Sequence, residues 1–364
     1  MNVVKATRRF EEWLGRRIRI VKKDLHLKHV AMKSDAFRFF RATYYRWAQV
    51  WPEVCPELAK APHVLAVGDL HVENFGTWRD IEGRLVWGVN DFDEAYFLAY
   101  ANDLVRLAVS AHLAAEAGHL PLDRKDICDA ILDGYQTSLR QGGKPFLLGE
   151  NHVWLRNVAE GELRDPVVFW KKMDALHTLK GRAPVSAIEA IEHLMPAHDL
   201  DYRIVHRVAG LGSLGHERYV AIAAWCGAKI AREGKALASS ACHWAEQQDG
   251  PSEILYQAIL SHSVRCPDPF VQLRGRWIVR RLSPHCSRIE LSQIKAQGIE
   301  MRLLHAMGWE TANIHLGARS TAKTILRHLG KQKGRWLHTA SEEMLSAVQE
   351  DWKVWKKDGY DGYR

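Results

Sequence analysis

Cysteine is scarce in this chain, and long apolar runs are missing. Six cysteines occur among 364 residues, and neighbouring ones are at least 16 positions apart. This spacing excludes a Cys-x-x-Cys zinc or redox pair, and dispersed free thiols are typical of a reducing cytosol. No stretch approaches the roughly 18 uncharged apolar residues of a membrane-spanning helix, and the N-terminus lacks the apolar core of a signal peptide. We therefore expect a soluble, cytoplasmic protein without a membrane partner.

An evenly spread basic charge is missing as well. Lys and Arg number 51 against 43 Asp and Glu, which gives a net charge of +8, but the excess lies at the two ends. Residues 1–33 hold ten basic and three acidic side chains, residues 319–364 hold ten and six, and the part between them is slightly acidic. Basic ends admit a nucleic acid as partner. Because such a charged face is usually only solvated, this partner is the less favoured one.

The pattern of apolar residues predicts an α+β protein of more than one compact unit. We expect helical segments at 1–55 and 291–364, a mixed segment at 56–200 and a strand-containing segment at 201–290. Within them the periodicity predicts helices at 8–23, 35–51 and 184–194, helices starting near Asn102 and Asp123, and strands at 63–67, 84–89 and 202–208.

Two of the expected strands end in acidic motifs. The strand at 63–67 runs into Gly68-Asp69-Leu70-His71-Val72-Glu73-Asn74, and the strand at 84–89 runs into Asn90-Asp91-Phe92-Asp93. If the two motifs converge, each contact between like charges at about 4 Å costs on the order of 4 kcal/mol. A cation relieves that repulsion, and Mg²⁺ prefers a few carboxylate oxygens together with substrate phosphates. The simpler alternatives are an ordinary Gly-Asp turn and, for Asp103, a helix cap.

A third motif is Gly210-Leu211-Gly212-Ser213-Leu214-Gly215. Followed by a helix, it is a dinucleotide-binding pattern, with Glu233 as the acid that holds the ribose. Followed by a strand, it is a loop that covers a nucleotide. We favour the strand, because 217–225 can pair with 229–237 across Cys226-Gly227-Ala228, and because no parallel strand follows.

Residues 37–110 closely resemble an uncharacterised bacterial family, domain of unknown function 2252, through the motifs at Gly68–Gly76 and Asn90–Glu94. The Asp-x-x-x-x-Asn loop, the hairpin and the next strand-end Asp also resemble the protein-kinase-like superfamily, most of all its aminoglycoside and choline phosphotransferases. That resemblance implies a two-lobed fold with a circularly permuted order, since the glycine-rich loop follows the Asp69 loop. The segment 56–200 is then the catalytic lobe and 201–290 the nucleotide-binding lobe.

The same resemblance assigns roles to single residues. It implies that Asp69 is the general base, that Asn74, Asp91 and Asp93 hold Mg²⁺, and that Asp103 supports the catalytic loop. Gly210, Gly212, Ser213 and Gly215 then contact ATP, and Lys235 is the catalytic lysine that binds its phosphates. The chain departs from the family pattern around Lys235, where Lys229 is a fallback. The expected acidic partner is also irregular, with Glu253 as a candidate and Gln257 in the best-aligned position.

These assignments predict an ATP- and Mg²⁺-dependent transferase, a kinase-like enzyme that moves the γ-phosphate to a hydroxyl of a small molecule. Three alternatives stay open. The same cleft could transfer a nucleotidyl (AMP) group, the protein could be an inactive nucleotide-binding sensor, or it could bind nucleic acid. A metallophosphoesterase is disfavoured, because the chain lacks the later Gly-Asp-x-x-Asp and Gly-Asn-His motifs of those enzymes.

Overall fold

The computed structural model describes residues 1–159, 165–248, 253–286, 298–317 and 319–360. They form a mixed α+β fold with fifteen α-helices and three antiparallel sheets. The helices before the large sheet are α1 (Val3–Gly15), α2 (Lys22–Ser34), α3 (Ala36–Ala42), α4 (Tyr44–Val54), α5 (Pro56–Ala59), α6 (Tyr100–Glu116), α7 (Arg124–Gln141), α8 (Val153–Ala159), α9 (Pro166–Asp174) and α10 (Val185–Glu192). Those that follow are α11 (Ala241–Ala245), α12 (Tyr256–His262), α13 (Glu300–His315), α14 (Arg319–Leu329) and α15 (Trp336–Asp358).

The strands fall into two short sheets and one large sheet. The short sheets contain β1 (His63–Ala66) with β4 (Tyr96–Ala99), and β2 (Phe75–Arg79) with β3 (Leu85–Val89) and β5 (Phe146–Leu147). The large sheet has the order β6-β7-β8-β10-β9, with β6 (Tyr202–His206), β7 (Arg218–Trp225), β8 (Ala228–Ala236), β9 (Val271–Arg274) and β10 (Trp277–Leu282).

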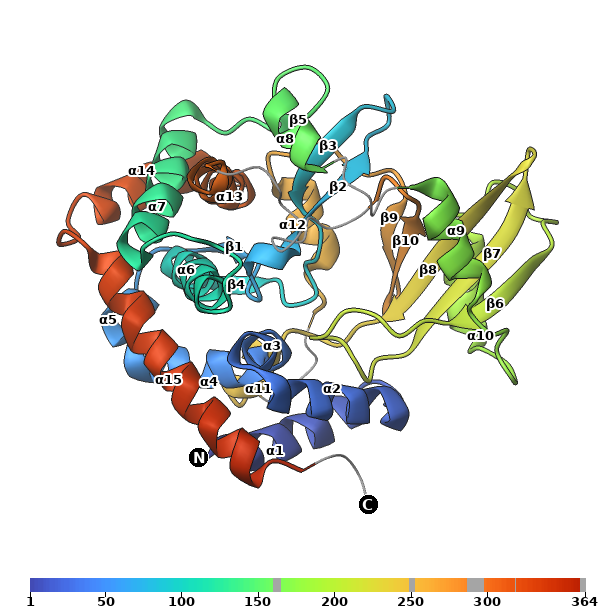
Figure 1. Ribbon diagram of the computed structural model, residues 1–364, viewed down its shortest axis with the longest axis horizontal. Coiled ribbons are helices and arrows are strands. Elements are labelled where there is room, and N and C mark those ends of the chain that lie inside the picture. Colours follow the sequence, from blue (N-terminus) through green and yellow to red (C-terminus); the bar gives the residue numbers. More distant parts are fainter. Residues whose placement is uncertain (160–164, 249–252, 287–297, 318, 361–364) are drawn as a thin grey trace.

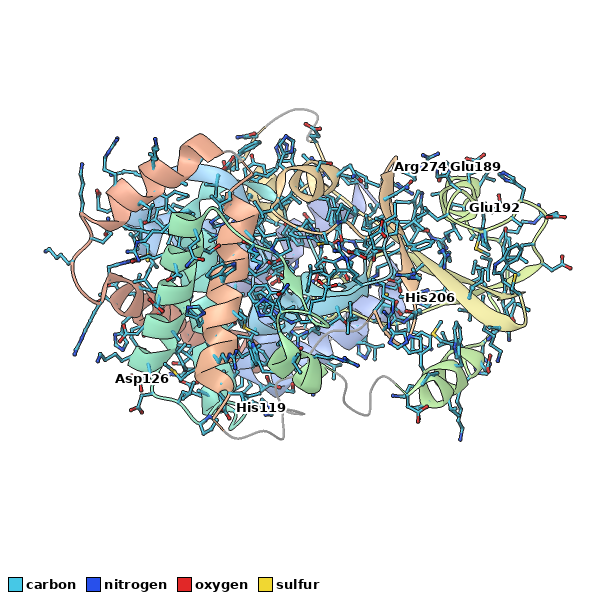
Figure 2. All side chains as sticks on the ribbon, turned by 90° about the horizontal axis from the view of Figure 1, so that it is seen from above. His119, Asp126, Glu189, Glu192, His206 and Arg274 are labelled. Atoms are coloured by element: carbon cyan, nitrogen blue, oxygen red, sulfur yellow. The ribbon has the colours of Figure 1, made fainter. Side chains whose placement is uncertain are left out.

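Two bodies lie side by side in Figure 1. We call the large sheet with α9 and α10 the sheet body, and the remaining elements the helical body. Figure 2 shows Glu192 and Arg274 at the end of the molecule formed by the sheet body, and Asp126 and His119 in the helical body. Within the described residues, no helix combines the length and the apolar character needed to cross a membrane.

Helix α6 is the centre of the helical body, and almost all of its residues are buried. The helix packs against α15, α7 and β1, and its buried residues include the polar Asn102, Asp103, Arg106, Ser110 and His112 as well as apolar ones. The C-terminal helices are part of this core. A Cβ added to Gly134 of α7 would lie 1.9 Å from the His305 carbonyl oxygen of α13, and one added to Gly308 would lie 2.0 Å from the Ile131 carbonyl oxygen. The two backbones therefore touch at a pair of glycines.

Most predicted elements are confirmed, including the strands at 63–67, 84–89 and 202–208. A strand, β7, follows the glycine-rich segment and pairs with β8, so the dinucleotide-binding alternative is wrong. The register differs by one residue from the predicted one, because Trp225 pairs with Ala228 and the turn holds two residues instead of three. The turn between them places Cys226 and Gly227 at φ values of 46° and 80°. These left-handed conformations suit a two-residue hairpin turn. The predicted division of the chain at residues 55, 200 and 290 stays a prediction.

Two expected helices are broken. The helix predicted at 8–23 is two helices, because Ile20 forms a β-bridge with His216 and the Val21 amide donates to the Gly215 carbonyl oxygen. Tertiary partners for the backbone outweigh helix propensity there.

The helix predicted at 35–51 is interrupted at Thr43, whose hydroxyl donates to the carbonyl oxygen of Phe39 (2.8 Å). Such a bond competes with the regular helical pattern.

Candidate functional site

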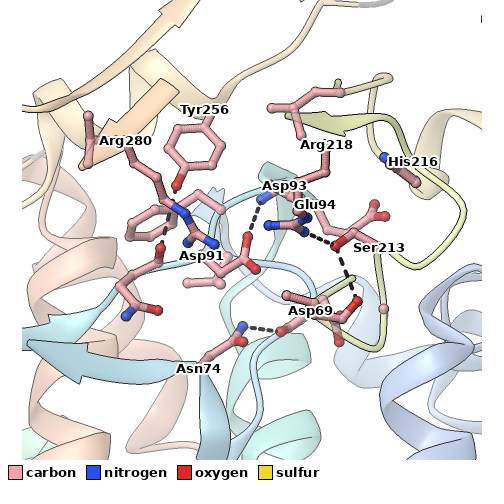
Figure 3. A pocket seen from close by; sticks show the side chains of 18 of the residues that line it. Asp69, Asn74, Asp91, Asp93, Glu94, Ser213, His216, Arg218, Tyr256 and Arg280 are labelled. Carbon is pink, nitrogen blue, oxygen red and sulfur yellow. Dashed lines mark hydrogen bonds between the residues drawn. The ribbon is translucent and has the colours of Figure 1, made fainter. Parts of the chain in front are cut away.

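A cavity of about 550 Å³ lies where the two bodies meet. This volume is within the range of pockets that enclose a nucleotide-sized ligand. Its walls include all three sequence motifs: Asp69 and Asn74 of the first, Asp91 and Asp93 of the second, and the glycine-rich segment. Figure 3 shows these side chains around one space. The structure thus brings together residues that are up to about 140 positions apart in the chain.

The loop that carries Asp69 is held by α6. Asp103 of α6 accepts hydrogen bonds from the backbone amides of Val67 (2.7 Å) and Gly68 (3.0 Å), which is the supporting role expected of it. Gly68 adopts φ +78°, and a Cβ there would lie 2.3 Å from the carbonyl oxygen of Glu94. Only glycine fits this position. The hydrogen bonds to Asp103 and the close packing at Gly68 therefore fix the Asp69 loop in the ligand-free protein.

The Asp69 carboxylate is bound on one oxygen only. Arg106 Nε (3.0 Å) and Nη2 (2.5 Å) both donate to Oδ1, and Oδ2 lies beneath Gly212. Arg106 is itself fully buried, with its guanidinium over the rings of Phe40, Tyr44 and Trp47. Burial raises the pKa of Asp69, although Arg106 opposes this shift. One oxygen is thus fixed in place, and the other is left to accept a proton.

Asn74 joins the two acidic motifs. Its side-chain amide Nδ2 donates to the Asp69 carbonyl oxygen (2.6 Å), as drawn in Figure 3, and its own carbonyl oxygen accepts from the Asn90 amide (3.0 Å). The β2–β3 hairpin lies between them and brings the second motif back to the first. Because Nδ2 is occupied, Oδ1 is the Asn74 atom that can serve a ligand.

Lys235 of β8 pairs directly with the second motif. Its ammonium contacts Asp93 and lies 3.6 Å from Asp91 Oδ1. Lys235 and Arg280 outweigh the effect of burial and lower the pKa of Asp91, whereas burial and the neighbouring Asp91 raise the pKa of Asp93. The lysine and the acidic loop therefore form one charged cluster that joins the two bodies.

Asn74, Asp91 and Asp93 are the residues proposed to hold Mg²⁺. Within the described residues, Asp93 Oδ1 is buried without a hydrogen-bond partner, so a bound cation could satisfy this oxygen. The described residues contain no group of three or more His, Cys, Asp or Glu side chains arranged to hold a metal by themselves. Two carboxylates and an amide oxygen nevertheless fit Mg²⁺, because this ion commonly keeps waters and takes phosphate oxygens as its remaining ligands.

The glycine-rich segment covers Asp69. Gly210 and Gly215 have φ values of +74° and +102°, and a Cβ on Gly212 would lie 3.5 Å from Asp69 Oδ2. Ser213 Oγ accepts from Arg218 Nη2 (2.8 Å) and donates to the Gly210 carbonyl oxygen (3.4 Å). A Cβ at position 212 would thus contact the Asp69 carboxylate, which shows how closely this segment passes over it.

The sequence left the acidic partner of Lys235 open, with Glu253 as one candidate. In the described part of the chain its ion pairs are with Asp93 and Asp91, and neither Glu253 nor Gln257 takes part. Gln257 instead accepts a hydrogen bond from the Leu273 amide (3.3 Å). The fallback, Lys229, pairs with Asp174 away from the cavity lining, at an exposed position. The lysine strand faces the acidic loop because β8 is central in its sheet, a placement that local sequence does not reveal.

Sequence reasoning also missed a group of arginines. Glu233, two residues before Lys235, is completely buried and pairs with Arg207 (2.6 Å), Arg218 (2.7 Å) and Arg280 (2.8 Å). Burial alone would raise the pKa of Glu233, but the three guanidiniums hold it well below its usual range. One carboxylate offsets one of the three positive charges. The wall of the cavity that contains these arginines is therefore cationic. They come from three separate segments of the chain, so no local pattern in the sequence marks them as a group.

Arg265 is a further cationic group that no sequence motif marks. Its guanidinium lies over the rings of Trp78 (4.5 Å) and Phe92 (5.1 Å), and its Nε and Nη1 are buried without hydrogen-bond partners. Burial lowers the pKa of Arg265, and Glu310 is the first charged group that opposes this shift. Because a buried unpaired charge is costly, Arg265 is suited to an anionic ligand in the cavity.

Glu310 provides a test of this electrostatic environment. It is 2% exposed, and burial raises its pKa to about 7, so its ionisation disfavours the folded state. The folded protein is thus expected to lose stability from this group as the pH rises from about 4.5 to about 7, by about 3 kcal/mol. In urea unfolding, the stability of Glu310→Gln relative to wild type should increase from pH 5 to pH 8. A difference that does not change with pH would contradict the raised pKa.

One part of the chain matches a known protein family. Residues 17–161 match the model of a family described as an uncharacterised protein conserved in bacteria, DUF2252. This match covers less than half of the chain and includes both acidic motifs, and it supports the resemblance noted in them. No curated protein and no solved structure gives a significant match.

Proposed function

We propose that the protein is a kinase-like phosphotransferase, which moves the γ-phosphate of ATP to a hydroxyl of a small molecule in the presence of Mg²⁺. The observation that carries this proposal is that negatively and positively charged side chains line one cavity. The Asp69, Asp91 and Asp93 carboxylates line one part of the cavity, and Arg207, Arg218 and Arg280 line another part together with the glycine-rich segment. Lys235 is not among the lining residues, and it reaches the site through its ion pairs with Asp93 and Asp91. A metal–triphosphate is the ligand whose charges such a pair of walls matches.

The order of elements supports a permuted kinase-like fold. In the sheet body, strand β6, the glycine-rich segment, β7 and the lysine-bearing strand β8 follow one another, and α12 stands between β8 and the last two strands. The loop with Asp69 precedes all of them in the chain. A kinase-like small lobe that follows its catalytic loop in the chain would have this order of elements.

The geometry around Asp69 suggests the chemical step. With Oδ1 held by Arg106, Oδ2 accepts the proton of the acceptor hydroxyl, whose oxygen bonds to the γ-phosphorus while the bond to the bridging oxygen of ADP breaks. Mg²⁺ bound at Asp91, Asp93 and Asn74 would offset the negative charge of the phosphates. Lys235 would contact those phosphates once its ion pair with Asp93 is shared with them.

A specific observation favours nucleotidyl transfer as a second candidate. Arg207, Arg218 and Arg280 surround Glu233, and Figure 3 places Arg280 on the opposite side of Asp91 from Asp69. A triphosphate whose terminal phosphate lies against these arginines would present its α-phosphate to the acidic loop. Transfer would then release pyrophosphate rather than ADP. Analysis of the products by mass spectrometry separates the two reactions.

A thermal-shift titration tests the nucleotide site itself. At about a hundred times Kd, one ATP site should add roughly 2.7 kcal/mol of stability in the presence of Mg²⁺. The control is adenosine, which lacks the phosphates that the cationic wall would bind. Stabilisation without any consumption of ATP would favour the inactive sensor. The absence of a shift with every nucleotide would contradict the cleft assignment.

The unpaired Arg265 gives a separate prediction. We expect Arg265→Met to weaken ATP binding about tenfold, because a charge-assisted hydrogen bond contributes on the order of 1.5–3 kcal/mol. Folding stability should be kept or increased, since the change removes a buried charge without a hydrogen-bond partner. Isothermal titration calorimetry measures the affinity, with Arg274→Met on the exposed end of β9 as matched control. Equal affinities for the two variants would exclude Arg265 from the binding site.

A further inference from the structure

The N-terminal helices contact the glycine-rich segment, although no motif links them. The ammonium of Lys28, on α2, donates to the carbonyl oxygen of Gly212 (2.8 Å). Gly212 is the residue that lies over Asp69 Oδ2. Lys28 is buried and lines the cavity. Burial lowers its pKa, and the charges of Glu11, Glu94 and Asp69 oppose this shift. Lys28 therefore joins the covering segment to the side of the cavity that holds the proposed general base.

Other contacts fix the same segment at its end. The Val21 amide donates to the Gly215 carbonyl oxygen (2.8 Å), and Ile20 forms a β-bridge with His216. Asp24 of α2 lies 2.8 Å from His206 Nε2, at the end of β6 where the segment leaves the sheet. Figure 1 shows α2 beneath the connection between β6 and β7. The segment is thus held where it leaves and where it re-enters the sheet.

The middle of the segment is held by apolar packing. Leu211 packs against a cluster formed by Val3, Met32, Phe39, Ala42 and Trp355. These residues come from α1, α2, α3 and α15, which lie outside the sheet body. A glycine-rich loop without such contacts would be free to move relative to the helices. Here the backbone of the loop is positioned by helices at both termini of the described chain.

We propose that Lys28 is a positioning residue that holds the glycine-rich segment over Asp69, and that α1 and α2 are a third part of the site. This proposal rests on the proposed function only for its effect on ATP. The placement of the segment is a property of the ligand-free protein. The two parts can be measured separately.

The first measurement is amide hydrogen exchange of the ligand-free protein. Lys28→Met removes the donor and keeps the length of the side chain, and we expect about tenfold faster exchange in peptides covering 207–217. Lys23→Met, on the exposed side of α2, is the matched control. Val21→Pro is an independent variant, because it removes the donor to Gly215 at a φ of −84°, near the range that proline adopts. It should also speed exchange at 213–217. Peptides from α6 should stay unchanged in all three variants.

The second measurement is the kinetics of ATP consumption. A misplaced covering segment should raise the KM for ATP about tenfold in Lys28→Met and change kcat by less than threefold. Partial unfolding alone would instead lower kcat and leave KM unchanged. Wild-type exchange rates in both Lys28→Met and Val21→Pro would overturn the proposal. Faster exchange in a protein that binds no nucleotide would leave the positioning role in place and refute the proposed function.

Discussion

Asp69→Asn should lower the rate of ATP consumption by about 10²- to 10⁴-fold, the usual cost of losing a positioned general base. Asparagine keeps the shape of the side chain and can still accept from Arg106, but its amide cannot take up the acceptor proton. The affinity for Mg-ATP should change little, because Asp91, Asp93 and Lys235 are left in place. Rates measured at saturating ATP and corrected for the folded fraction give the comparison.

The control for this experiment is Asp126→Asn, at the exposed start of α7. Figure 2 shows Asp126 in the helical body, at the end of the molecule away from the sheet body. This variant removes the same charge without touching the cavity lining, so its rate should equal that of wild type. A wild-type rate for Asp69→Asn would refute the general-base assignment, whatever nucleotide affinity it retained.

Arg106→Met should destabilise the protein by about 3–5 kcal/mol, the cost of breaking a buried ion pair from one side. Arg106 is fully buried and is the only ion-pair partner of Asp69 among the described residues. Its loss would leave a carboxylate of the cavity wall uncompensated, and the contacts of the guanidinium with three aromatic rings would also disappear. Urea unfolding at neutral pH measures the change.

The double variant Asp69→Asn/Arg106→Met separates these contributions. If the penalty comes from the unpaired carboxylate, neutralising Asp69 should recover a large part of the stability that Arg106→Met loses. If it comes from packing against Phe40, Tyr44 and Trp47, the double variant should be no more stable than Arg106→Met. Recovery of stability without recovery of turnover is the result expected for the proposed mechanism.

Local features of the sequence predicted the strands and their acidic ends. Each buried run before Gly68-Asp69 and Asn90-Asp91 is a strand, and the turn at Cys226-Gly227 pairs β7 with β8 as expected. Such signals depend on residues a few positions apart. The break in the helix predicted at 8–23 depends on Gly215 and His216, almost two hundred positions away, and no local pattern contains that information.

In the candidate site too, local sequence patterns do not show which distant residues the fold brings together. Asp69, Asn74, Asp91, Asp93 and the glycine-rich segment were found through motifs, and the structure brings them to one cavity. Lys235 pairs with Asp93 but is not itself among the lining residues. Their roles stay predictions. Arg106, Arg265 and Lys28 carry no motif, and each matters because of what the fold places beside it. An arginine within the predicted apolar stripe that starts near Leu104 is a signal that could have drawn attention to Arg106.

The glycine contact between α7 and α13 has a consequence for how the protein is made. Gly134 and Gly308 are separated by more than 170 residues, yet each helix needs the other's backbone at van der Waals distance. During synthesis, α6 and α7 leave the ribosome long before α13 does. The apolar surface of α6 and α7 that the C-terminal helices cover is therefore exposed to solvent in the interval. We expect residues 17–161, expressed without α13 and α15, to aggregate rather than fold. We expect the nascent chain to bind a chaperone until α13 and α15 have been synthesised.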